Sequence, residues 1–242
     1  MSSPQGASSI GEGDCQEVPD DHVVTIDEFD ARTKRFHYLG TSVRLYQATL
    51  KGDWRVAKAL YEKYPDVFRH PITEWNEIPL HIAIASKHTA FAKEMVKCMT
   101  PDDIALPDNN GNTALMLVAE FGIVSTAKEL VEINKDLPLI RGSGGSTPLQ
   151  VAALNGRRRM VSYLYEVTHF EDLEPMERID ILVATISTDT YDIALKILKK
   201  DRTLATMENS NGRIALQELA RKPFAFDSRS QLSIWERCLM SG

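Results

Sequence analysis

The sequence contains few cysteines and no long hydrophobic run, and both absences narrow its class. Its three cysteines, Cys15, Cys98 and Cys238, lie far apart and form no Cys-x-x-Cys pair. This spacing argues against a disulfide framework and is typical of a reducing compartment. No run of about 18 residues is apolar, so we expect that this chain does not insert into a membrane. Because a secretory signal is also lacking, we expect a cytoplasmic location, with the nucleus as the alternative.

Lysine and arginine are absent from residues 1–30, which contain eight acidic residues. The whole chain has a net charge of −6, so removing this −8 leaves about +2 for the remainder. We expect residues 1–40 to be a disordered acidic leader, either a solvating tail or an interaction segment, and residues 41–242 to fold. The densest basic run, residues 157–159, is interpreted as a solvated face, with docking of an acidic partner as the alternative. Without aromatic residues among the basic ones, nucleic-acid binding is not indicated.

An apolar helix-start signature recurs along the chain at a nearly constant interval. Its anchors are Leu45, Leu80, Leu115, Leu149, Ile181 and Leu216, which gives steps of 35, 35, 34, 32 and 35 residues. Apolar residues at i, i+1, i+4 and i+5 follow the first five anchors and predict a second, amphipathic helix in each unit. The period and the motif Thr147-Pro148-Leu149 resemble ankyrin repeats. We therefore predict an all-α ankyrin-repeat solenoid of about six helix–turn–helix units.

Turn-forming residues separate the predicted helices. Between the two helices of a unit we expect a residue that ends the first helix in a left-handed conformation, which favours glycine. The residues at this position are Gly52, Lys87, Gly122, Gly156 and Thr188. Between units, an extended link and a stretch rich in Gly, Asn and Ser predict short β-hairpin fingers, with Asn76 at the glycine position of the second unit. The fifth unit lacks a recognisable finger, so we expect it to be degenerate.

No motif indicates a catalytic, cofactor or metal site. The glycine-rich residues 142–145 lack the Lys and Ser/Thr of a phosphate-binding loop, so we interpret them as a finger turn. Asp20-Asp21-His22 has no second cluster at metal-ligand spacing. We expect the ring of His81 to bond backbone groups of neighbouring fingers. No nucleophile has a base at a suitable spacing, so we predict a protein that is not an enzyme and uses no cofactor or metal.

A protein partner is expected on the concave side, which fingers and first helices line. Two variable positions follow each first-helix signature, and Leu50, Phe121 and Leu154 are apolar there without an evident packing role. Trp75 falls in a finger, where an exposed indole would anchor a partner. The predicted contact residues are Leu50, Lys51, Trp75, Glu120, Phe121, Leu154 and Asn155.

Residues 43–242 resemble the repeats of a plant ankyrin family. The resemblance rests on Leu45-Tyr46-Gln47-Ala48, Gly52-Asp53-Trp54, Ile72-Thr73, Pro79-Leu80-His81 and Leu137-Pro138-Leu139-Ile140-Arg141. In full-length members the repeats precede a membrane domain, the PGG domain, and are linked to defence, cell death and salt stress. The resemblance therefore implies a non-enzymatic protein-interaction scaffold in plant stress or defence signalling. The alternative is the cytosolic regulatory portion of a membrane-anchored signalling protein, here without its C-terminal transmembrane domain.

Overall fold

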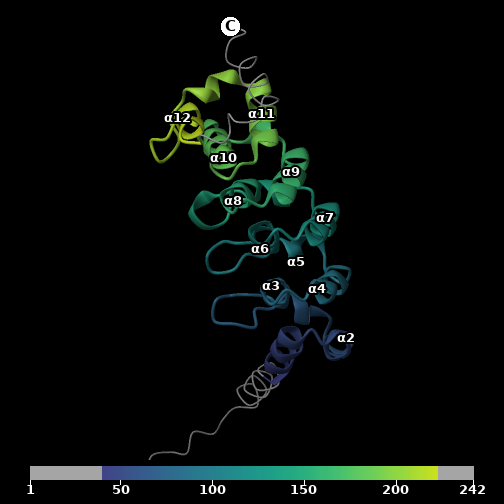
Figure 1. Ribbon diagram of the computed structural model, residues 1–242. Helices are drawn as coiled ribbons and strands as arrows, with labels where there is room; N and C mark the ends of the chain where they lie inside the picture. Colours follow the sequence, from purple (N-terminus) through teal and green to yellow (C-terminus); the bar gives the residue numbers. More distant parts are fainter. Residues whose placement is uncertain (1–39, 223–242) are drawn as a thin grey trace, which may run out of the picture. The chain divides into compact units, whose positions relative to one another are not determined.

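A computed structural model describes residues 40–222, which form successive pairs of antiparallel helices (Figure 1). The first helices of the pairs are residues 40–51, α3 (Pro79–Ala85), α6 (Ala114–Phe121), α8 (Pro148–Leu154), α10 (Pro175–Ser187) and α12 (Ala215–Ala220). The second helices are α2 (Trp54–Lys63), α4 (Thr89–Val96), α7 (Val124–Ile133), α9 (Arg158–Val167) and α11 (Tyr191–Lys200). This arrangement confirms the predicted all-α solenoid of repeated helix pairs.

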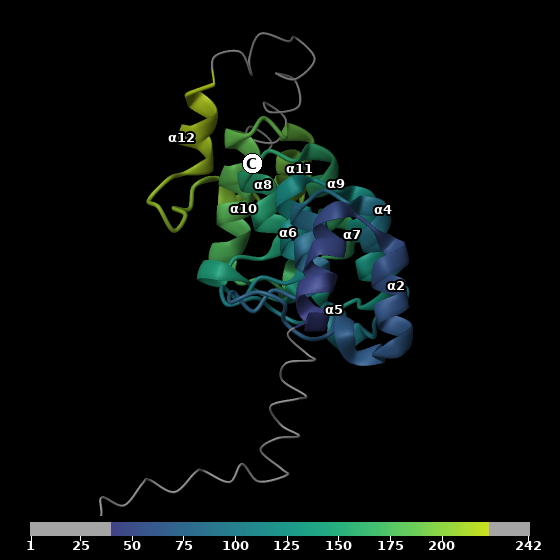
Figure 2. The same ribbon diagram turned by 90° about the horizontal axis from the view of Figure 1, so that it is seen from below.

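The helices pack in two rows. First helices contact first helices from α3 to α12, and second helices contact second helices from α4 to α11. Figure 2 shows the two rows side by side. Contacts are more extensive within the row of first helices, so this row is the inner side of the stack. No helix in the described part of the chain is long and apolar enough to cross a membrane.

The hydrophobic core runs through the stack because each repeat buries the same positions. The side chains of Leu45, Leu80, Leu115 and Leu149 are entirely buried. Burying a leucine stabilises the fold by about 1.5–3 kcal/mol, so this recurring position contributes to the stability of each of these repeats. Leu216, the anchor predicted for the sixth unit, is 42% exposed instead. Within the described residues, the sixth unit contains only the first helix of its pair, α12.

The fifth repeat has a different register from the one predicted. Left-handed residues end the first helices at positions 52, 87, 122, 156 and 189, each seven residues after a fully buried leucine. In the fifth repeat these residues are Asp189 and Leu182, so the assignments of Thr188 and Ile181 were wrong by one position. The cause is local: no finger precedes α10, and both Ile181 and Leu182 are buried.

The links that follow the second helices were predicted to be extended. In the structure, each link begins with a short helical turn. These turns are η1 (Pro65–Phe68), α5 (Pro101–Ile104), η2 (Leu137–Leu139), η4 (Phe170–Asp172) and η5 (Arg202–Ala205). Each turn buries an apolar side chain, for example Phe68, Ile104 and Leu137. The turn is therefore part of the core of each repeat. The acidic leader, Cys15, Cys238 and Asp20-Asp21-His22 lie outside the described residues.

Candidate functional site

The fingers precede the first helices and project from the same side of the stack (Figure 1). Each finger is numbered by the repeat that it begins, so residues 72–77, 108–112, 142–146 and 209–213 are the second, third, fourth and sixth fingers. A backbone hydrogen bond closes each one: Ile72 N–H donates to Glu77 O (2.8 Å), Asp108 to Asn112 (3.0 Å), Gly142 to Ser146 (2.9 Å) and Asn209 to Arg213 (2.8 Å). Among the described residues they form no β-strands, only one isolated bridge between Glu208 and Ile214. The predicted β-hairpins are therefore tight turns, because each loop is too short to add a second pair of strand residues.

Trp75 lies at the tip of the finger before α3, and its side chain is 67% exposed. The neighbouring finger holds its backbone in place: Asn109 N–H donates to Trp75 O (2.9 Å) and Asn109 Nδ2 donates to Glu74 O (3.0 Å). Asn76 Nδ2 returns a hydrogen bond to Pro107 O (3.0 Å). Asn76 has a φ of 59°, which confirms the predicted left-handed residue. Two fingers therefore hold the backbone that carries the exposed indole.

Gly142 lets the third finger bind the fourth. In the third finger, Asp108 Oδ1 accepts hydrogen bonds from Asn110 N–H and Asn112 N–H, both at 2.8 Å. The fourth finger has Gly142 at the aspartate's position, and Asn112 Oδ1 accepts from Ser143 N–H instead (3.0 Å). A Cβ atom on Gly142 would lie 2.5 Å from that oxygen. Gly142 thus leaves space for the Asn112 side chain, which accepts from a different backbone N–H than those that Asp108 binds in its own finger.

His81 has the structural role predicted for it. Its side chain is fully buried, and its Nδ1 accepts a hydrogen bond from Ile78 N–H (3.2 Å). Nε2 makes no hydrogen bond of regular geometry but interacts with the backbone of Asn112 in the next finger. Burial lowers the pKa of His81 to about 4, against the opposing effects of Asp108 and the Asn112 backbone. The ring is therefore neutral at neutral pH and links its own helix to the third finger.

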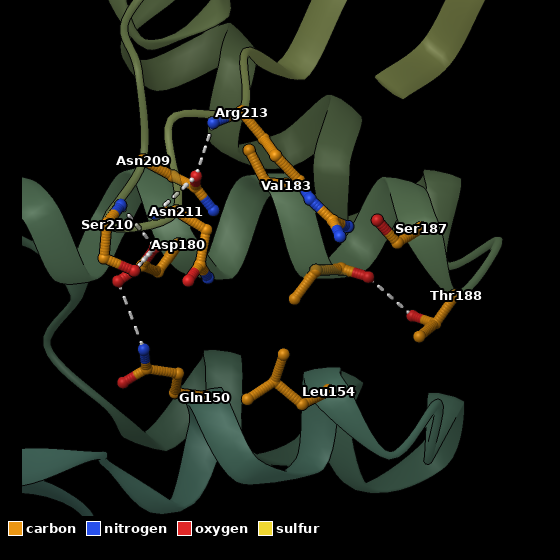
Figure 3. A pocket seen from close by; sticks show the side chains of 11 residues that line it. Gln150, Leu154, Asp180, Val183, Ser187, Thr188, Asn209, Ser210, Asn211 and Arg213 are labelled. Carbon is orange, nitrogen blue, oxygen red and sulfur yellow. Dashed lines mark hydrogen bonds between the residues drawn. The ribbon is translucent and has the colours of Figure 1, made fainter. Parts of the chain in front are cut away.

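A groove opens between α8, α10 and the last finger, with a volume of about 150 Å³ (Figure 3). On one side, Asp180 accepts hydrogen bonds from Ser210 N–H (3.1 Å), Ser210 Oγ–H (2.8 Å) and Gln150 Nε2–H (3.4 Å). On the other side, Leu154 is 61% exposed. The groove lies next to the repeat without a finger, where α10 has 13 residues and α8 has 7. The sequence analysis did not identify Asp180, although this carboxylate occupies the same position in the fifth repeat as Thr147 does in the fourth.

The fifth repeat has no finger, and the start of its first helix, α10, contacts the fourth finger instead. Arg141 donates to Glu177 through Nε (2.7 Å) and a terminal NH2 group (3.0 Å). Partial burial favours a raised pKa for Glu177, but the hydrogen bonds from Arg141 and the Glu174 backbone outweigh it and lower the pKa. Glu177 is therefore ionised at neutral pH and neutralises Arg141.

The predicted contact residues fall in two places. Leu50, Lys51, Glu120, Leu154 and Asn155 are exposed at the C-terminal ends of first helices, whereas Trp75 lies in a finger. Phe121, at the end of α6, is half-buried and packs against the hydrophobic core. The expectation that Phe121 has no packing role was therefore wrong. In the basic run, Arg157 Nε donates to the carbonyl of Glu120 (2.7 Å), so this arginine joins two repeats.

The comparison with protein families identifies the repeats. A family model described as "Ankyrin repeats (3 copies)" matches residues 45–139 and 80–176. The chain belongs to the ankyrin-repeat family. A solved structure that it resembles is a chain in the "Crystal Structure of the Yeast Ribosomal Protein Rps3 in Complex with its Chaperone Yar1", with 20% sequence identity and a TM-score of 0.49. That likeness covers 55% of this ankyrin-repeat chain and 95% of the other.

Two plant proteins are similar in sequence to this ankyrin-repeat chain. The "Probable E3 ubiquitin-protein ligase XBOS32" of Oryza sativa subsp. japonica is 29% identical over 116 residues, which cover 48% of this chain and 23% of the rice protein. The "E3 ubiquitin-protein ligase XBAT32" of Arabidopsis thaliana is 31% identical over 121 residues, which cover 50% and 23%. The matched segment thus spans less than a quarter of either relative.

Proposed function

We propose that this ankyrin-repeat chain is a non-enzymatic scaffold that binds another protein through its fingers and the concave row of first helices. The observation that carries the proposal is the position of Trp75, 67% exposed on a turn that Asn109 holds from the next finger. A tryptophan is among the residues that contribute most to protein interfaces. Holding the backbone of this turn in place before binding lowers the entropy cost of association.

The exposed side chains on the first helices form a second part of the proposed surface. Leu50 and Leu154 are 44% and 61% exposed, and Lys51 and Asn155 are exposed next to them in sequence. Glu120 is exposed next to Phe121. Large apolar side chains in water add binding free energy when a partner covers them. Phe121 is already half-buried, so we assign it a smaller contribution.

For the biological setting, we propose plant stress or defence signalling at a cytoplasmic location. The two plant relatives support a plant setting, and the resemblance of residues 43–242 to the repeats of the PGG-domain family supports the signalling role. In a membrane-anchored relative the same surface would serve as the cytosolic regulatory portion. Its partner would still be a protein, so both settings require the same binding surface.

A second candidate is substrate recognition for ubiquitin transfer. Both curated relatives are named E3 ubiquitin-protein ligases, and the ankyrin segment is the part that this chain shares with them. In this role the repeats would hold the protein to be modified, and ubiquitin transfer would need a further domain or partner. An in vitro ubiquitination assay with the purified chain alone should then give no product, and product formation would contradict the non-enzymatic proposal.

Affinity capture from plant tissue with the full 242-residue chain tests the scaffold role. The double change Trp75→Ala and Leu154→Ala should lower the affinity of a captured partner by about thirtyfold or more, which corresponds to about 2 kcal/mol. The matched control is Glu132→Gln, which changes an exposed residue on the second helix α7 and should leave binding unchanged. Equal binding by the double variant and the parent would contradict the assignment of the surface.

A further inference from the structure

The exposed indole of Trp75 is surrounded by negative charge. Residues 71–78 and 105–113, here called the Trp75 finger pair, contain the carboxylates Glu74, Glu77 and Asp108 and no Lys, Arg or His. Asn109 joins the two segments through its hydrogen bonds to Trp75 and Glu74, so the charges lie in one rigid unit. The surface therefore combines an aromatic face with acidic neighbours.

The arginines of the flanking segments do not neutralise this unit. Arg69 pairs with Asp103 (3.4 Å) and Asp66 (3.7 Å). Arg141, in the next finger, makes its two hydrogen bonds to Glu177. His81 lies near Asp108 but is neutral, because burial lowers its pKa to about 4. Across the described residues, the Glu74 carboxylate makes no hydrogen bond or ion pair. The negative charge beside Trp75 is therefore available to a partner.

We infer that the Trp75 finger pair binds a lysine- and arginine-rich segment of the partner protein. This inference rests on the proposed scaffold function and adds the chemistry of the partner. A tryptophan ring is the best aromatic partner for a Lys or Arg cation, because its face carries negative electrostatic potential. The carboxylates beside it attract the same cations and speed their approach at low salt. An acidic or purely apolar partner would leave these carboxylates without a partner at the interface.

The rigidity of the finger pair favours an extended segment over a deep insertion. Asn76 in its left-handed conformation and the hydrogen bonds between Asn109 and residues 74–75 fix the turn. The indole itself is 67% exposed. A basic side chain can lie across the ring while its neighbours pair with Glu74 and Asp108.

The test uses the full chain and a short labelled peptide of Lys, Arg and Gly, with a Glu/Gly peptide of equal length as a charge control. Binding is measured by fluorescence anisotropy at low and high ionic strength. The basic peptide should bind more tightly than the acidic one, and salt should weaken it. Trp75→Ala should weaken binding about three- to thirtyfold, the range that cation–π contacts span, and Trp75→Phe should retain part of the affinity. Glu74→Gln should weaken it several-fold.

Two controls make the result specific. Glu132→Gln neutralises an exposed carboxylate on α7 and should leave peptide binding unchanged. The eight acidic residues of positions 1–30 also attract a basic peptide, but that attraction does not depend on Trp75. If Trp75→Ala and Glu74→Gln bind the basic peptide as well as the parent does, the inference is overturned. If a captured partner needs Trp75 but is insensitive to salt and to Glu74→Gln, the inference fails and the scaffold function stands.

Discussion

Protonation of His81 should destabilise the second repeat as the pH falls below about 6.5, the usual pKa of histidine. The ring is fully buried, and its Nδ1 accepts the hydrogen bond from Ile78 N–H. A proton on Nδ1 would remove that bond and place a charge in the core. Burial accordingly lowers the pKa of His81 to about 4 in the folded protein.

The sign and size of the effect follow from these two pKa values. Between about pH 6.5 and 4 the unfolded chain binds a proton that the folded protein does not, so acid lowers the free energy of unfolding. The contribution of His81 is present above pH 6.5 and is lost as the pH falls toward the folded pKa. The loss between about pH 7 and pH 5.5 is about 1 kcal/mol, and it approaches about 3 kcal/mol near pH 4.

The assay compares urea unfolding of the parent and His81→Asn, followed by circular dichroism at both pH values. Asparagine can still accept from Ile78 N–H but does not titrate, so the variant should be less stable at neutral pH and lose about 1 kcal/mol less on acidification. His169→Asn, at an exposed position, checks that the effect belongs to the buried ring. If the parent and His81→Asn lose the same free energy on acidification, the linkage argument is refuted.

Three further substitutions test the packing of individual repeats. Leu149→Ala should lower the free energy of unfolding by about 2–5 kcal/mol, because the side chain is fully buried, and hydrogen exchange should show the loss around α8 rather than from end to end. Gly142→Ala should cost about 1–3 kcal/mol in urea unfolding, because the new methyl group would clash with Asn112; an unchanged midpoint would show that the finger shifts freely. Asp180→Ala should speed hydrogen exchange in residues 209–213, because it removes the acceptor for Ser210, and unchanged exchange would contradict that role.

The sequence was sufficient to predict the repeated helix pairs because burial follows the repeat period. Leu80, Leu115 and Leu149 are buried at equivalent positions, and an amphipathic pattern follows each one. The left-handed conformation of Asn76 was predictable for a local reason, since few residues other than glycine tolerate it. These features depend on each residue and its own repeat.

The parts that the sequence did not predict depend on contacts between repeats. The register of the fifth repeat was off by one, because Ile181 and Leu182 are both apolar and no finger marks the helix start. The bracing of Trp75 by Asn109 joins residues 34 positions apart, which no local pattern indicates. Phe121 occupies an exposed position by its place in the repeat, but its ring packs on the core. Such contacts require the neighbouring repeat to be in place.

Site-specific photo-crosslinking tests the central claim, that a protein partner binds the inner side of the repeats at the fingers, most directly. A photoreactive phenylalanine analogue replaces Trp75 in the full chain, and a matched chain has it at Glu132 on α7. After irradiation in plant extract, we expect the probe at position 75 to give a discrete protein adduct that excess unlabelled chain removes. The probe at position 132 should give no such adduct. An adduct from position 132 and none from position 75 would contradict the account and place the partner on the second helices.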